Sequence, residues 1–261
     1  MTATSATSAN FDFGRVVSNT FNVIGSNFRE LAILSVLLIG LPSGVLGWAQ
    51  VVLTNGGDAA NLTGVAAVLL GLGGYLATVV GSTLLQAATV RVTVATLNGD
   101  ATSPIRELQK SVAVILPVFM LGLLMGVGIV LGAIFFVVPG IILAVLWMVA
   151  MPVYVVEMPG VFASLGRSRN LTRGHRWPIF GLLVVYLVAY FVVSMVLGGV
   201  IGAASAVGGG LTAITISSVV SAAISGAVAG VVAPAGIAAI YYELRVIKEG
   251  VGAAQLAAVF D

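Results

Sequence analysis

The chain contains no cysteine and a single histidine, His175. The absence of cysteine excludes disulfides, thiolate metal ligands and thiol catalysis. One histidine cannot form a multi-histidine metal site, so we expect neither a metal nor a cofactor. Serine or threonine catalysis at Ser164, Ser168 or Thr172 would have only His175 as a nearby base, with no acid partner in the same loop. The sequence therefore predicts a protein that is not an enzyme.

Charge is also scarce. Only 8% of the 261 residues are charged and 59% are hydrophobic, with a mean hydropathy of +1.16, whereas soluble domains carry about 25% charged residues. A globular core of this length could not hide so much apolar surface from water, so the expected solvent is lipid. The net charge of +2 gives no reason to expect a nucleic-acid partner.

Six apolar stretches are long enough to consider as membrane spans, and they predict an all-α integral membrane protein. They cover residues 31–53, 62–97, 112–137, 141–156, 178–206 and 211–247. Between the third and the fourth, Val138-Pro139-Gly140 is expected to form a tight turn. Pro152 is expected to bend the short fourth span.

The basic residues predict how the chain is threaded. All eleven lysines and arginines precede the first span, or lie at the ends of spans two, four and six or in the segments that follow them. The connections 54–61, 138–140 and 206–210 contain none, and Asp58 is their only charge. The positive-inside rule then places both termini in the cytoplasm.

The cytoplasmic segments also resemble one another. Three times an apolar helix ends at a glycine (Gly99, Gly160 and Gly250) and a short amphipathic piece follows, and the chain opens with a fourth such piece in residues 11–28. We interpret this as three transmembrane hairpins, each preceded by a short cytoplasmic interfacial helix. The alternative is that any inner loop of a membrane protein looks this way. The predicted layout is one transmembrane domain over 1–261: a tail and amphipathic helix (1–30), hairpin one (31–98), interfacial helix and hairpin two (99–158), interfacial helix and hairpin three (159–247), and a tail (248–261).

Small residues recur every four positions in spans five and six. Gly198 and Gly202 form one such row, and Gly226 and Gly230 belong to the other. This spacing puts them on one helix face, where backbones can approach closely. We expect these glycines to pack helices within the chain. The alternative is a face for a homo-oligomer or a membrane-protein partner, or a hinge that slides.

Thirteen residues within 138–180 carry a resemblance to a known family: Pro139, Gly140, Trp147, Pro152, Glu157, Gly160, Arg167, Ser168, Leu171, Thr172, Gly174, Trp177 and Phe180. This stretch resembles the membrane region found beside glycerophosphoryl diester phosphodiesterases and the related stand-alone membrane proteins of bacteria. The resemblance implies a helical domain of a bacterial inner (cytoplasmic) membrane. It does not imply phosphodiesterase activity, which belongs to a separate soluble barrel with acidic metal ligands and histidines.

Four charges lie shortly before the three glycines: Arg91, Glu157, Glu243 and Arg245. If the repeats pack side by side, these charges meet just below the lipid headgroups as an ion network, because partly buried charges need partners. We expect Glu157 to be structural and to pair with Arg91 or Arg245.

A second cluster follows in the motif RSRNLTRGHRW. Its members are Arg167, Arg169, Arg173, His175, Arg176 and Trp177, and we expect them to bind lipid phosphate, because arginine forks suit phosphate oxygens. The alternative is ordinary topology anchoring. The leading hypothesis is a non-enzymatic inner-membrane protein that engages phospholipid, as a lipid-binding or membrane-assembly factor. Two alternatives stay open: a transporter of a small neutral or amphipathic solute, and a structural subunit or partner of a larger membrane complex.

Overall fold

A computed structural model of the chain describes residues 11–54, 62–208 and 211–250. These residues form helices without strands, which confirms the all-α prediction. Six stretches are long and apolar enough to cross a membrane, as predicted: Phe28–Leu53, Thr63–Leu97, Ile115–Phe135, Val137–Glu157, Arg176–Val200 and Val219–Glu249.

The first two apolar stretches form one closely packed helix pair. The first consists of α2 (Phe28–Ser35), a π-helical turn (Val36–Gly40) and α3 (Leu41–Thr54), and the second is α4 (Leu62–Leu97). The widened turn precedes Pro42, which has no N–H to donate to the carbonyl of Leu38. That carbonyl faces Gly81 of α4, where a Cβ would collide with it. The glycine therefore lets the two helices touch at the bulge.

The next two apolar stretches differ from the prediction at their connection. The third is α6 (Ile115–Phe135), and the fourth is divided into α7 (Val137–Trp147) and α8 (Ala150–Glu157). The expected turn at 138–140 is wrong, because α7 begins before it and the chain turns at the extended residue Phe136. Pro139 is tolerated there because N–H groups in a first helical turn have no intrahelical acceptor. The division before α8 follows from Pro152, which cannot donate to the carbonyl of Met148.

The last two apolar stretches are the long helices α10 (Arg176–Gly208) and α11 (Leu211–Glu249). Three shorter helices precede or connect the long ones: α1 (Phe13–Ser26), α5 (Pro104–Val112) and α9 (Val161–Thr172). Gly99, Gly160 and Gly250, the glycines expected to end helices, all have positive φ angles, a backbone conformation that costs glycine little. The segment after Gly250 that was expected to be amphipathic lies outside the described residues.

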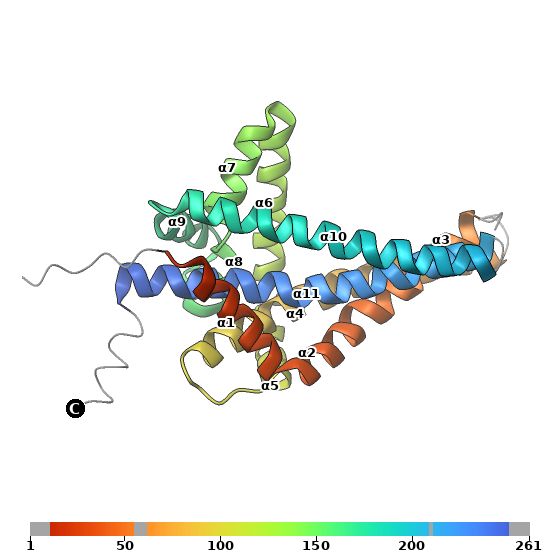
Figure 1. Cartoon of the computed structure of the whole chain (residues 1–261), viewed down its shortest axis with the longest axis horizontal. Coiled ribbons are helices and arrows are strands. Elements are labelled where there is room, and N and C mark those ends of the chain that lie inside the picture. The colour runs from red at the N-terminus through yellow and green to blue at the C-terminus, as the bar shows by residue number, and fades with distance from the viewer. Residues whose placement is uncertain (1–10, 55–61, 209–210, 251–261) are drawn as a thin grey trace, which may run out of the picture.

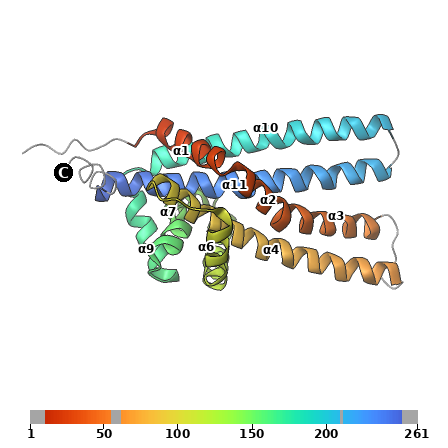
Figure 2. The ribbon, with the colours of Figure 1, turned by 90° about the horizontal axis from the view of Figure 1, so that it is seen from below.

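The long helices run along one axis and a third pair lies across it. Figures 1 and 2 show α3, α4, α10 and α11 extending along the length of the molecule, while α6 and α7 run across that direction in both views. Chain neighbours pack together in each pair, α3 on α4, α6 on α7 and α10 on α11, and α11 also packs on α4 and α1. In one flat bilayer, α6 and α7 cannot stand along the membrane normal together with the other four in this arrangement.

The N-terminal helix α1 has two apolar edges. One edge is buried against α11 and α4 through Val16 and Val23. The other edge, Phe13, Val17 and Phe21, is exposed. A helix that presents apolar side chains on both edges needs an apolar medium on its open side.

Two of the four predicted packing glycines face the first apolar stretch. A Cβ at Gly226 would meet Ile39 of the π turn at 3.6 Å, and a Cβ at Gly230 would overlap the same side chain. Among the described residues, a Cβ at Gly198 would reach only Ser221, at 4.0 Å, and one at Gly202 would meet no atom within 4 Å. The tight contact is therefore at Gly230, where α11 meets the side chain of Ile39 in the first apolar stretch.

Candidate functional site

The site is built on the sharp corner that follows α8. Met158 adopts the left-handed conformation at the end of α8, and Gly160 has a φ of 100° before α9 begins. These two residues turn α9 back over the end of α8. The hydroxyl of Ser164 donates to the carbonyl of Gly160 at 2.8 Å, and the hydroxyl of Ser168 donates to the carbonyl of Leu146 in α7 at 2.8 Å. Thr172 donates to the carbonyl of Ser168 within α9, so all three buried hydroxyls are hydrogen-bonded and that of Ser168 joins α9 to α7.

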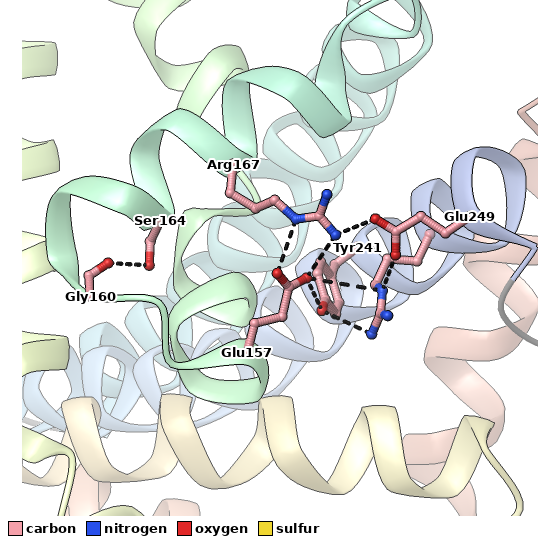
Figure 3. A network of polar contacts seen from close by, with 7 residues as sticks. Glu157, Gly160, Ser164, Arg167, Tyr241 and Glu249 are labelled. Carbon is pink, nitrogen blue, oxygen red and sulfur yellow. Dashed lines mark hydrogen bonds and ion pairs between the residues drawn. The ribbon is translucent and has the colours of Figure 1, made fainter.

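Five side chains then meet in an inner ion network, formed by Glu157, Arg167, Tyr241, Arg245 and Glu249 (Figure 3). Arg167 donates to both oxygens of Glu157, at 3.0 and 3.3 Å, and also bridges to Glu249. Tyr241 donates its hydroxyl to Glu157 at 2.8 Å, while Arg245 lies 4.0 Å from Glu157 and donates to Glu249 at 2.8 Å. Acids and arginines alternate, so each charge faces one of the opposite sign.

The network stabilises the protonated, charged form of Arg167. The hydrogen bond to Glu157 is the main reason why the pKa of Arg167 is raised above its ordinary value; partial burial opposes it and Glu249 adds to it. Both acids and both arginines are partly exposed, with side-chain exposures between 22% and 34%. Within the described ranges, no group of three or more His, Asp or Glu side chains could hold a metal ion. The arrangement joins α8, α9 and α11 electrostatically.

The partner of Glu157 differs in part from the expectation. Arg245 is nearby, as expected, but Arg91 is not a partner: its Nε is buried without a hydrogen-bond partner in the described structure. The closest arginine is Arg167, for which the sequence predicts contact with lipid phosphate. The reason is geometric, because the corner at 158–160 brings α9 back to the end of its own preceding helix.

Glu243 lies outside this network, although we expected it there. Its carboxylate is 1% exposed and receives two hydrogen bonds from Arg15 of α1, one of them from Nε at 2.7 Å. The hydrogen bond to Glu243 is the main cause of the raised pKa of Arg15. This bidentate pair attaches the N-terminal helix to α11.

Three arginines of the predicted lipid cluster line one cavity, which we call the basic cavity. It has a volume of about 490 Å³ and is lined by Gly166, Arg169, Asn170, Arg173 and Arg176. The first four lie on one face of α9 and its end, at the spacing i, i+3, i+4, i+7, and Arg176 begins α10. Lys248 donates to the carbonyl of Asn170 and is electrostatically repelled by Arg173 and Arg176.

Besides Arg167, two members of the predicted cluster do not line the basic cavity. His175 has a buried Nδ1 without a hydrogen-bond partner in the described structure, and its ring packs near Phe11. Trp177 is 82% exposed, and in the described part of the chain its only aromatic neighbour is Phe180, in a T-shaped pair. The structure therefore separates Arg169, Arg173 and Arg176 from Arg167 and His175.

Sequence reasoning missed three members of the ion pairs formed by Glu157, Glu243 and Arg245, namely Arg167, Arg15 and Glu249. Arg245 and Glu249 are four residues apart on one helix, a spacing that is visible in the sequence. Arg167 follows Glu157 across a glycine corner, a weaker signal. Arg15 and Glu243 are separated by 228 residues, and no local pattern connects them.

No protein-family model, curated protein or solved structure matches this chain. The resemblance of residues 138–180 to the phosphodiesterase-associated membrane region thus stays a prediction.

Proposed function

We propose that this chain is a non-enzymatic, multi-pass membrane protein that binds the phosphate of an anionic phospholipid in the basic cavity. The observation that carries the proposal is the charge of that cavity. Arg169, Arg173 and Arg176 converge on it, and none of them forms an ion pair with a carboxylate in the described ranges. Neighbouring cations repel one another unless an anion lies between them, and arginine binds phosphate oxygens through two parallel hydrogen bonds.

The surroundings of the cavity suit the membrane surface. Trp177 is exposed beside Arg176, and aromatic side chains of this kind favour the headgroup level. The basic segment follows an apolar stretch of the chain, where each Lys or Arg near an anionic leaflet contributes about 1 kcal/mol. The proposal includes the threading with both termini in the cytoplasm of a bacterial inner membrane, and interfacial positions for α1, α5 and α9.

The test compares two variants of equal charge. The first replaces Arg169, Arg173 and Arg176 with glutamine. The control replaces Arg29, Arg106 and Lys110, which are exposed and lie outside the basic cavity. We expect the first variant to copurify with much less anionic phospholipid, measured by native mass spectrometry, while the control retains it. An equal loss of anionic phospholipid in both variants would show that the three arginines act only as general positive charge at the membrane surface.

The transporter alternative has less support. A path for a solute needs polar groups that face it. The hydroxyls of Thr78, Ser82 and Thr83 in α4 donate instead to carbonyls of their own helix, at 2.8, 3.0 and 2.8 Å. A role as a subunit of a larger complex is the other alternative, and the exposed apolar tip at residues 134–138 is the surface that favours it. A protein retained in the same mass spectra would support that role.

A further inference from the structure

An apolar groove lies between α1, α10 and α11, close to the basic cavity but separate from it. Its volume is about 250 Å³, and it is lined by four residues of α1, five of α10, five of α11 and Met148. Only Thr20 and Tyr186 among them carry a polar side-chain atom. The Thr20 hydroxyl donates to the carbonyl of Val16 at 2.8 Å, so it has no need of a ligand.

The groove has a defined shape because α1 is held firmly on α11. Val16 and Val23 are buried beneath α1, and the Arg15–Glu243 pair attaches the same helix near the groove. Gly236 lies in the α11 wall, where even a Cβ would reach Thr20 at 3.9 Å. The helices α1 and α11 are thus in contact where Thr20 meets Gly236.

The mouth opens where the surrounding medium is apolar. The walls contributed by α10 (residues 182–189) and α11 (residues 232–240) lie within the candidate spans Arg176–Val200 and Val219–Glu249. Val17, Phe21 and Val185 line the groove and are between 41% and 62% exposed. In a membrane, the chemistry available at such an opening is the acyl chain.

The groove and the basic cavity share helix α10. Arg176 lines the basic cavity and Leu182 lines the groove. Six residues of α-helix separate them, which is about 9 Å at a rise of 1.5 Å per residue. One molecule with an anionic head and an apolar chain would satisfy both features at once.

We propose that this groove holds one acyl chain of the anionic phospholipid whose phosphate lies against Arg173 and Arg176. The inference rests on the proposed function and deepens it, because it states that the protein recognises the chain as well as the headgroup. The α1 helix then forms part of the lipid site, and its exposed edge contacts the same leaflet.

The test fills the groove without touching the arginines. Ala189 lines the groove, and its neighbour Val188 is exposed outside it. We expect Ala189→Trp to lower the affinity for phosphatidylglycerol about tenfold, a loss of about 1.4 kcal/mol, and Val188→Trp to leave it within about twofold. The measurement is a native mass-spectrometry titration of the detergent-solubilised protein with phosphatidylglycerol, alongside the arginine variant described above.

The outcomes separate the two proposals. If both tryptophan variants bind phosphatidylglycerol like the unaltered chain while the arginine variant does not, the headgroup site stands and the groove proposal is overturned. If the arginine variant also binds normally, the proposed function itself fails.

A second measurement avoids any dependence on the folding of Ala189→Trp. A benzophenone-bearing residue replaces Val185 at the groove mouth or Val188 outside it, in vesicles with a minority of phosphatidylglycerol in phosphatidylcholine. We expect the probe at position 185 to cross-link phosphatidylglycerol above its share of the lipid, and the probe at position 188 to cross-link both lipids in proportion. Proportional cross-linking at both positions would overturn the groove proposal.

Discussion

The carboxylate of Glu243 in α11 is almost completely buried and accepts two hydrogen bonds from the guanidinium of Arg15 in α1. The two residues lie at opposite ends of the chain and fix the N-terminal helix against the last one. Without its arginine, Glu243 would be a buried acid that lacks a counter-charge. Such a group costs free energy or becomes protonated.

We therefore expect Arg15→Gln to lower the free energy of unfolding by about 2 to 3 kcal/mol. The double variant with Glu243→Gln should be less destabilised than Arg15→Gln alone, because no unpaired charge is left behind. Thermal unfolding in detergent measures the stability of the single and the double variant. Arg29→Gln is the control, since Arg29 is exposed on the neighbouring helix. A double variant as unstable as the single one would show that the pair contributes packing only.

The second prediction concerns the role of Glu157. Removing its charge leaves Arg167 with Glu249 alone, so Glu157→Gln should cost about 1 to 2 kcal/mol. In a double-mutant cycle, Glu157→Gln and Arg167→Gln should couple by about 1 kcal/mol, whereas Glu157→Gln and Arg91→Gln should add within about 0.5 kcal/mol. Stronger coupling to Arg91 would contradict the observed pairing. Normal stability of Glu157→Gln with loss of the cellular phenotype would make Glu157 a working group and not a structural one.

The third prediction compares two positions on α11. Gly230 faces Ile39 without room for a Cβ, while Val228 is 47% exposed. Gly230→Leu should therefore destabilise the protein by about 1 to 3 kcal/mol through overpacking. Val228→Leu should change the stability by less than about 0.5 kcal/mol. Equal tolerance of both substitutions in thermal unfolding would mean that the face of α11 containing Gly230 contacts lipid.

The fourth prediction is the threading. The chain has no cysteine, so each engineered variant carries a single thiol. Thiols at Asp58→Cys and Gly208→Cys should react with an impermeant reagent added to intact cells whose outer membrane is permeable. Thiols at Gln109→Cys and Ala163→Cys, which are exposed positions of α5 and α9, should not. External labelling of Ala163→Cys would overturn the threading.

A thiol at Val138→Cys in the same assay tests the orientation of α6 and α7 relative to the membrane. Val138 belongs to the exposed apolar tip of this pair, which the structure directs across the long helices. If the tip is embedded in lipid, we expect no reaction from either side. Reaction from outside would instead show that the pair stands along the membrane normal and that all six stretches cross.

The helical class and the six apolar stretches were predictable from the sequence alone because they depend on local properties. Length, hydropathy and the positions of glycine and proline act over a few residues, and the positive φ angles at Gly99, Gly160 and Gly250 are local too. The prediction of a turn at 138–140 was wrong for a local reason as well. In the sequence, a proline in the first turn of a helix cannot be distinguished from a proline in a loop.

Only the tertiary structure decided which charges meet. The sequence placed Glu157, Glu243 and the arginines in the same layer of the protein, but the partner of each depends on how α1, α9 and α11 fold over one another. Arg15 reaches Glu243 across 228 residues, and the corner at Met158 and Gly160 brings Arg167, instead of Arg91, to Glu157. Likewise, the hydropathy of the sequence identifies α6 and α7 as apolar segments. It does not predict that they cross the long helices, because hydropathy carries no information about the orientation of a helix.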